Sequence, residues 1–294
     1  GAASATVAAA WPVRGAERWA REWIASQRGL GYETSLEAPG RDDPFGFWAR
    51  SRERTTLALR DALAPPARRA WLPPTVALAL LLGAISLATL LLVARRGPRA
   101  ERRVRSLLAF VNLAVYGFSQ WAWAHVTRAT DLSGALPLHL CDLAAFIAGF
   151  ALITGNRTCI LLTYYWGLAG TVQGLATPAI DIGFPHPAAF SFFLHHFAVV
   201  AAALYFPVVL RWRADTPFWR SPLRAFAWLN GYVVLAVAAN AILGTNFGFL
   251  AGKPENPSLL DHLGPHPLYI LWLELIALAL FALLTLPVRQ PTPG

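Results

Sequence analysis

The sequence has little charge and little cysteine. Only 14% of its residues are charged, against about 25% in an ordinary soluble domain, so a typical soluble composition is excluded. Two cysteines cannot build a disulfide framework. Lysine is almost absent, since Lys253 is the only one among 25 basic residues. Methionine is missing and residue 1 is Gly, as expected of a chain whose start is truncated or processed.

Long apolar runs are what the sequence does contain. It is 56% hydrophobic, and about 20 apolar residues suffice to cross roughly 30 Å of hydrocarbon as a helix. We find no internal repeat, and prolines mark the ends of several runs, as is usual at helix boundaries. The pattern predicts an all-α, polytopic membrane protein with seven transmembrane helices, at residues 74–94, 104–127, 135–154, 158–178, 188–210, 222–245 and 265–287.

The basic residues beside these runs predict an orientation. Twelve fall in loops on one side of the expected membrane and six on the other, and cytoplasmic loops carry the excess of Lys and Arg. We therefore expect the N-terminus outside and the C-terminus inside. The net charge of +9 does not indicate nucleic-acid binding, because the arginines lie beside apolar spans and in the N-terminal region. Abundant Arg, Ala, Gly and Pro are typical of a GC-rich genome, which favours the inner membrane of a bacterium.

The chain divides by composition into three parts. Residues 74–288 form the expected seven-helix domain, and 289–294 form a short tail. Residues 1–73 are charged and lack the apolar core and cleavage site of a signal peptide. This N-terminal extension is expected to be disordered or to lie at the membrane interface, where the apolar face of residues 16–27 would fit.

Polar residues inside the apolar runs fall at similar depths. At about 1.5 Å of rise per residue, the expected topology brings side chains from six helices to the outer third of the bilayer. Ionisable groups are costly there and are functional candidates by default. The members of this polar layer are His125, His139, Cys141, Asp142, Gln173, His195, His196, Asn240 and Glu274.

The polar layer allows more than one chemistry. Cys141 could be a nucleophile with His195 or His196 as its base and Asp142 or Glu274 as the orienting carboxylate, since a thiol needs such activation. Alternatively, His139, His195, His196 and a carboxylate could hold zinc, although the spacing matches no HExxH motif. Ser191, four residues before His195, offers a further nucleophile.

Each member also has a purely structural interpretation. Cys141 belongs to a stripe of small residues that lets helices approach closely. His139 could simply neutralise Asp142, which lies on the same helix face. No metal or cofactor is predicted.

A series of motifs at these positions resembles a known family. They are LPLHLCDL at 136–143, YYWGLAGTVQGLATP at 164–178, GFPH at 183–186, FFLHHF at 192–197, GTNFGFL at 244–250 and KPENPSLLDHLGPHPLYILWLE at 253–274. Residues 74–288 thereby resemble the YwaF-like integral membrane proteins of bacteria, which are related to vertebrate transmembrane protein 164.

The resemblance implies a function. The vertebrate relative is regarded as a cysteine-dependent acyltransferase of membrane phospholipids, so Cys141 would be the nucleophile and His195 the base. We therefore expect a lipid acyltransferase or ester hydrolase, with membrane phospholipids and an acyl-donor lipid as partners. A transporter or binding protein with a polar intramembrane cavity is the alternative, and the oligomeric state stays open.

The outer loop between the last two spans would lie over the polar layer. Asn246 and Lys253 are candidates to contact a lipid headgroup, with Gln173 and Asn240 as further substrate-binding candidates. The same loop could instead be a lid that caps helix ends, because Asn, Pro and Gly are turn formers.

Overall fold

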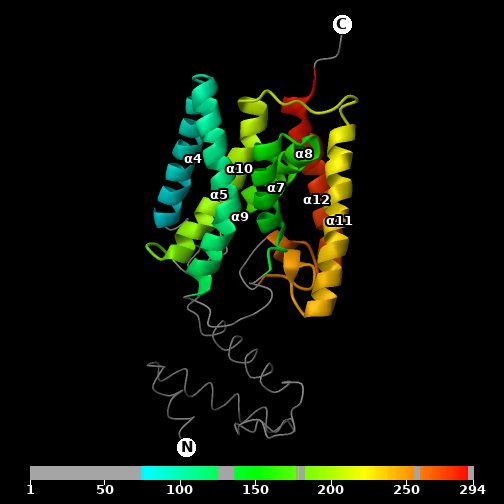
Figure 1. Ribbon diagram of the computed structural model, residues 1–294. Helices are drawn as coiled ribbons and strands as arrows, with labels where there is room; N and C mark the ends of the chain where they lie inside the picture. Colours follow the sequence, from blue (N-terminus) through cyan, green and yellow to red (C-terminus); the bar gives the residue numbers. More distant parts are fainter. Residues whose placement is uncertain (1–73, 125–135, 177, 179–182, 255–258, 291–294) are drawn as a thin grey trace, which may run out of the picture. The chain divides into compact units, whose positions relative to one another are not determined.

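The structure is a computed structural model that describes residues 74–124, 136–176, 178, 183–254 and 259–290. The predicted N-terminal extension and His125 lie outside these residues. The described elements are helical, and each of the seven predicted segments contains one or more of them (Figure 1). They are α4 (Pro74–Ala94), α5 (Pro98–Ala124), α7 (Leu140–Thr154), α8 (Arg157–Trp166), η1 (Gly167–Thr171), α9 (Val172–Ala176), α10 (Pro187–Val208), α11 (Arg220–Leu243), η2 (Phe247–Phe249), η3 (Leu259–His262), α12 (Leu268–Thr285) and η4 (Leu286–Val288).

Within the described residues, four helical segments are long and apolar enough to cross a membrane: α4, α10, α11, and α12 continued by η4. Helix α7 is apolar but shorter, with 15 residues. The described part of the chain therefore has the helices of a multi-pass membrane protein. Seven crossings and the orientation of the termini stay predictions.

Helix α10 forms the centre of the bundle. It packs against α4, α5, α7, α8 and η1, and 72% of its apolar window is buried, whereas none of the α4 window is. Small residues such as Ala202 and Ala203, both fully buried, let its neighbours come close. A helix that is apolar all round and buried in this way fits a bundle core.

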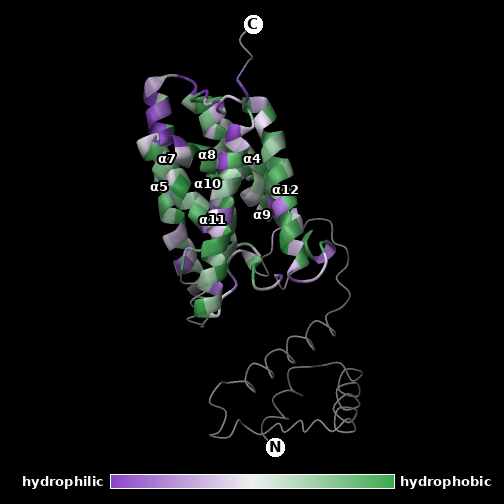
Figure 2. Ribbon diagram, turned by 90° about the vertical axis from the view of Figure 1, so that its right-hand side faces the viewer, coloured by the Kyte–Doolittle hydropathy of each residue, from purple (hydrophilic) through white to green (hydrophobic). Residues whose placement is uncertain are grey.

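The outer helices turn large apolar side chains outward. Leu82 on α4 is 53% exposed, Ile242 on α11 is 81% exposed and Leu275 on α12 is 57% exposed. Figure 2 shows long green stretches on α4 and α12, and purple residues gathered near the ends of the bundle. Soluble proteins rarely expose so much apolar surface to water, so these faces are suited to contact with lipid.

Two left-handed glycines end helices at opposite ends of the bundle. Gly155 stops α7 with φ +69°, and the side chain of Asn156 then accepts a hydrogen bond from the backbone of Cys159 to start α8. Gly244 stops α11 with φ +66°. A residue with a Cβ would be strained in this conformation, so these glycines fix where the chain reverses.

Hydrogen bonds between helices add to the apolar packing. Asn112 on α5 donates to the Ala198 carbonyl on α10 over 3.1 Å. On the other side of the bundle, the Tyr165 hydroxyl on α8 donates to Thr285 Oγ1 on α12 over 2.7 Å. Buried polar groups need such partners, so these bonds set how the helices are paired.

Candidate functional site

The first turn of α7 holds Cys141 and Asp142. His139 is the N-cap residue, and the bond from the Leu143 amide to the His139 carbonyl is the first of the helix, at 3.1 Å. The amides of the preceding turn therefore have no acceptor within the helix. The Asp142 carboxylate accepts from the backbone of His139, as an acidic residue does at the third position of a capping box. Local sequence thus fixes this carboxylate beside the thiol residue.

His195 on α10 joins both residues. Its Nε2 lies 3.1 Å from the carbonyl oxygen of Cys141, and its Nδ1 lies 3.7 Å from Asp142 Oδ1. The two side chains are 7% and 17% exposed, so the pair is shielded. A carbonyl only accepts hydrogen bonds, so Nε2 carries a proton in this arrangement. The imidazole bridges the main chain of one residue and the carboxylate of the next.

Thr171 closes the site from the fourth segment. It ends η1, a π-helical turn between α8 and α9, and its side chain is 1% exposed. The hydroxyl is the side-chain neighbour of the Cys141 thiol. Even so, Oγ1 meets no partner with full hydrogen-bond geometry among the described residues. A buried, unsatisfied hydroxyl on a π-turn is typical of a functional site.

Tyr232 on α11 borders the same site. Its hydroxyl donates to the Leu138 carbonyl over 3.0 Å, and it lies within electrostatic reach of Cys141 and Asp142. Neither Tyr232 nor Thr171 was predicted from the sequence. Three glycines between residues 167 and 174 were the available signal for an irregular turn near Thr171. An aromatic residue in an apolar helix gives no such signal.

Residues 244–254 form a lid beside the α7 N-terminus. Asn240, at the end of α11, holds the start of this lid through three bonds. Its Oδ1 accepts from the Phe247 amide at 2.7 Å and from the Thr245 hydroxyl at 2.9 Å, and its Nδ2 donates to the Phe247 carbonyl at 3.1 Å. The Asn240 side chain is therefore fully occupied in shaping the lid.

Aromatic contacts place the lid on the site. The Phe247 ring lies 5.3 Å from the His139 ring. Gly248 adopts φ +65°, and a Cβ at this position would lie 2.8 Å from the Tyr232 hydroxyl. The glycine is thus required both by its backbone conformation and by the close approach to Tyr232. The lid covers the turn that carries Cys141.

The other lid residues named as substrate contacts have local partners. Asn246 donates to the Gly252 carbonyl at 2.9 Å and accepts from the Ala251 and Gly252 amides at 2.9 and 3.1 Å. The Lys253 ammonium lies 5.7 Å from the centre of the Tyr269 ring. These contacts fit the interpretation of the loop as a lid. Headgroup binding by Lys253 stays a prediction.

The two remaining residues on α10 face other partners. His196 donates from Nδ1 to the Phe192 carbonyl at 2.8 Å, and its ring packs against Gly174 on α9. Ser191 donates to the Ala188 carbonyl at 2.9 Å. Their polar atoms are used within their own helix, whereas His195 reaches across to α7.

Glu274 has its hydrogen-bond partner on a different pair of helices. It accepts from Asn230 over 3.1 Å, joining α12 to α11, and both side chains are partly or fully exposed. Gln173, on α9, is exposed as well. Glu274 was expected at the depth of His195, but the structure pairs it with Asn230 instead.

A metal centre finds no geometric support in the described part of the chain. No three His, Cys, Asp or Glu side chains gather there closely enough to hold an ion. His139 packs against Phe247, and His196 points to Gly174, so the ligands of the zinc alternative do not converge on one point.

Apolar outer faces and a polar cluster at the end of a central helix define a multi-pass membrane protein. The chain belongs to the TMEM164 family, whose model matches residues 67–285. This confirms the family assignment made from the motifs. No curated protein and no solved structure matches the chain.

Proposed function

We propose that the protein transfers or hydrolyses acyl groups of membrane lipids, with Cys141 as nucleophile and His195 as general base. The observation that carries this proposal is the His195 imidazole, held between the Cys141 carbonyl at 3.1 Å and the Asp142 carboxylate at 3.7 Å. A nucleophile, a nitrogen base and an orienting carboxylate in this order are the parts that activated-nucleophile catalysis uses. Family membership supports a lipid substrate.

The first half of the reaction forms an acyl-enzyme. In the structure Nε2 donates its proton to the Cys141 carbonyl. The reaction starts when the imidazole gives up this bond and its proton lies on Nδ1, facing Asp142, so that the Nε2 lone pair meets the Cys141 thiol. His195 takes the thiol proton, and the thiolate attacks the carbonyl carbon of a lipid ester. The carbon–oxygen ester bond then breaks, and His195 returns the proton to the departing alkoxide. A thioester on Cys141 and a lipid alcohol result.

The α7 turn and Thr171 are suited to the charge that develops. The free amides at the start of α7 lie at the positive end of the helix dipole, which favours both a thiolate and an oxyanion. The unsatisfied Thr171 hydroxyl can donate to the sulfur anion. Both sets of donors are preorganised, so they need no rearrangement when the charge forms.

The second half of the reaction decides between the two activities. His195 removes a proton from water or from the hydroxyl of a second lipid, and the oxygen attacks the thioester carbon. The carbon–sulfur bond breaks, and the thiolate recovers the proton from His195. Water gives a free fatty acid, and a lipid alcohol gives a new ester.

The apolar faces of the bundle give an acyl chain a lateral approach. Lipid esters lie near the boundary of the hydrocarbon, and the predicted depth of Cys141 is near the outer end of its helix. We therefore place the reaction in the outer half of the bilayer, with the N-terminus outside and the C-terminus inside a bacterial inner membrane. The basic loops support this orientation.

The test is intact-protein mass spectrometry after incubation in lipid bilayers with a phospholipid whose acyl chain is isotopically labelled. We expect one acyl adduct that is absent from Cys141→Ala. It should form more slowly in His195→Gln, by roughly the 10²–10⁴-fold that a general base contributes. Thr171→Val, which removes the hydroxyl and keeps the shape, should slow it less.

The second cysteine provides a matched control. Cys159 is also half-buried and free, but it lies at the start of α8, at the other end of α7. Cys159→Ala should keep the adduct. An adduct lost equally in both cysteine variants would contradict the proposal. So would a folded wild-type protein that neither forms an adduct nor turns over lipid, a result that would favour the carrier or binding alternative.

A further inference from the structure

The end of the bundle opposite the α7 N-terminus is strongly basic. The connections at this end carry twelve arginines and two carboxylates, Glu101 and Asp215. Figure 1 shows these connections together, at the end where the C-terminus leaves the bundle. Glu101 is occupied by Arg105 at 3.1 Å and by the Tyr205 hydroxyl at 2.5 Å. Positive charge is therefore in large excess there.

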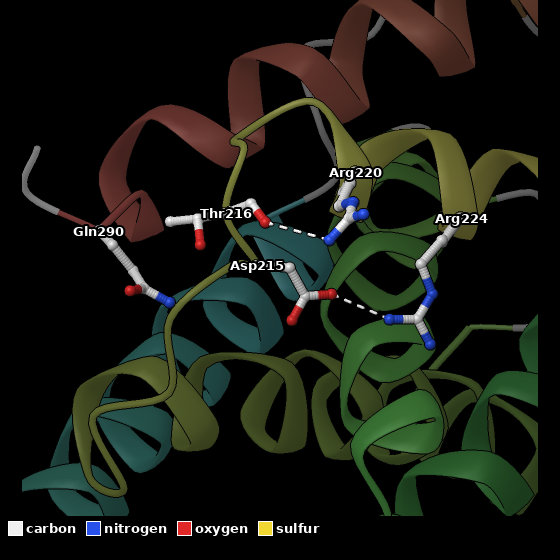
Figure 3. Close-up of a pocket in the computed structure, with 5 residues that line it drawn as sticks. All are labelled: Asp215, Thr216, Arg220, Arg224 and Gln290. Carbon is white, nitrogen blue, oxygen red and sulfur yellow. Dashed lines mark hydrogen bonds and ion pairs between the residues drawn. The ribbon is translucent and has the colours of Figure 1, made fainter.

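A cavity of about 360 Å³ lies within this basic end. Its walls come from the α10–α11 connection, the start of α11 and the segment after η4 (Figure 3). The volume falls within the usual range of ligand pockets, about 300–1,000 Å³. The lining residues are all polar or charged: Asp215, Thr216, Arg220, Arg224 and Gln290.

The two arginines of the cavity differ in how many of their donors already have partners. Arg224 pairs with Asp215 at 2.9 Å and reaches Thr158 Oγ1 at 3.5 Å. Among the described residues, Arg220 makes a single long contact, 3.5 Å to the Thr216 carbonyl. The side-chain amide nitrogen of Gln290 donates to the Ala214 carbonyl at 3.1 Å. This bond fixes the wall of the cavity that follows η4. One guanidinium thus faces the cavity with most of its donors unused.

Exposed aromatic residues lie beside the lining residues in the chain. Phe218 is 60% exposed and Trp219 is 51% exposed, and both lie in sequence between the lining residues Thr216 and Arg220. Trp and other aromatic side chains gather where a membrane meets water. This segment therefore has the composition expected at the level of lipid headgroups.

We propose that this cavity binds the phosphate group of an anionic lipid headgroup. Arg220 would supply a bidentate pair of donors to two phosphate oxygens, and the Thr216 hydroxyl would supply another. Arg224, paired with Asp215, offsets the negative charge of that carboxylate, which would otherwise repel the phosphate. The site is separate from Cys141 and does not depend on the acyl-transfer proposal. Basic pockets of this kind are established means of recognising anionic headgroups.

The test uses native mass spectrometry of the full chain released from detergent micelles with added phosphatidylglycerol or phosphatidylcholine. We expect tighter binding of phosphatidylglycerol to the wild type, and a loss of roughly five- to tenfold in Arg220→Gln. Arg220→Lys, which keeps the charge and loses the planar fork, should fall between the two. Phosphatidylcholine should bind the variants alike.

Arg99→Gln is the charge-matched control, because Arg99 is exposed at the same basic end but does not line the cavity. Its binding should stay close to that of the wild type. Equal losses in Arg99→Gln and Arg220→Gln, or no loss in Arg220→Gln, would overturn the proposal.

Competition identifies the source of the phosphate. Inorganic phosphate and glycerol 3-phosphate are added at millimolar concentration to the complex with phosphatidylglycerol. Retention of the lipid supports a headgroup site. Displacement that requires Arg220 would overturn the lipid assignment and make the cavity a site for a soluble phosphate.

Discussion

Replacement of Asn240 by alanine should loosen the lid over the α7 turn. The Asn240 side chain is 7% exposed and makes all three of its bonds to Thr245 and Phe247, which are themselves buried. Alanine would remove the partner of the Phe247 amide and of the Thr245 hydroxyl, while the Phe247 carbonyl would keep only its 3.4 Å bond from the Leu250 amide. Asn240 is one of several side chains that hold the lid, together with Asn246 and Tyr269, and its removal tests whether the start of the lid depends on these bonds.

The expected cost follows from the three bonds. Each buried hydrogen bond contributes about 1 kcal/mol net, and an orphaned partner costs at least as much. Asn240→Ala should therefore lower the free energy of unfolding by about 3 kcal/mol. For a domain of this size, each kcal/mol lowers the midpoint of thermal unfolding by about 2–4 °C, which gives a shift of roughly 6–12 °C.

Thermal unfolding in detergent, followed by tryptophan fluorescence, measures this shift. Asn156→Ala is the matched control, because the same substitution there removes one exposed cap bond to the Cys159 amide and should cost about 1 kcal/mol. Hydrogen exchange should also speed up at the Phe247 amide in Asn240→Ala. Equal shifts in the two variants, with unchanged exchange at Phe247, would refute the reasoning.

Two further changes test positions beside the site. Gly174→Ala would place a Cβ 2.6 Å from His196 Nε2, so it should destabilise the protein by about 1–3 kcal/mol through overpacking. Gly117→Ala, in a helix with open space around it, should be neutral or stabilising when measured by the same thermal unfolding. Glu274→Gln keeps an acceptor for Asn230 and should leave the rate of acyl-adduct formation unchanged in mass spectrometry. A large loss of adduct in Glu274→Gln would return this residue to the catalytic set.

The helical segments were predictable because helix length and helix ends leave separate signals in the sequence. Apolar runs give the length of each helix, and prolines and glycines give its ends. Residues 74–94 were predicted as the first span and form α4 with the same bounds. The π-turn at Gly167–Thr171 was not predictable in this way, since it depends on how closely α10 approaches. A Cβ on Gly167 would lie 3.0 Å from the Ala203 side chain, so the turn reflects tertiary packing.

The depth of the site residues along their helices was predictable, but the directions in which their side chains point were not. Rise per residue placed Cys141, Asp142 and His195 at one level, and the structure brings these three together. The same argument placed His196 and Glu274 at that level too, but depth is only one coordinate. Successive helical residues point about 100° apart, so His196 turns to Gly174 while His195 reaches α7.

Two ionisable groups inside the bundle, Glu274 and Asp142, are stabilised in different ways. The Glu274 carboxylate accepts a hydrogen bond from the Asn230 amide on a partly exposed surface. This bond is sufficient to stabilise the carboxylate there. Asp142 is held from two sides, by the backbone of its own helix and by His195 on another. The lid lies beside this turn, and a buried Thr171 hydroxyl there lacks a full partner. Asn112 Oδ1 on α5 is also buried without a partner among the described residues, so an unsatisfied atom alone does not mark a site. The combination of a carboxylate, an imidazole, a thiol and an unsatisfied donor in one cluster is what the proposed acyl transfer would use.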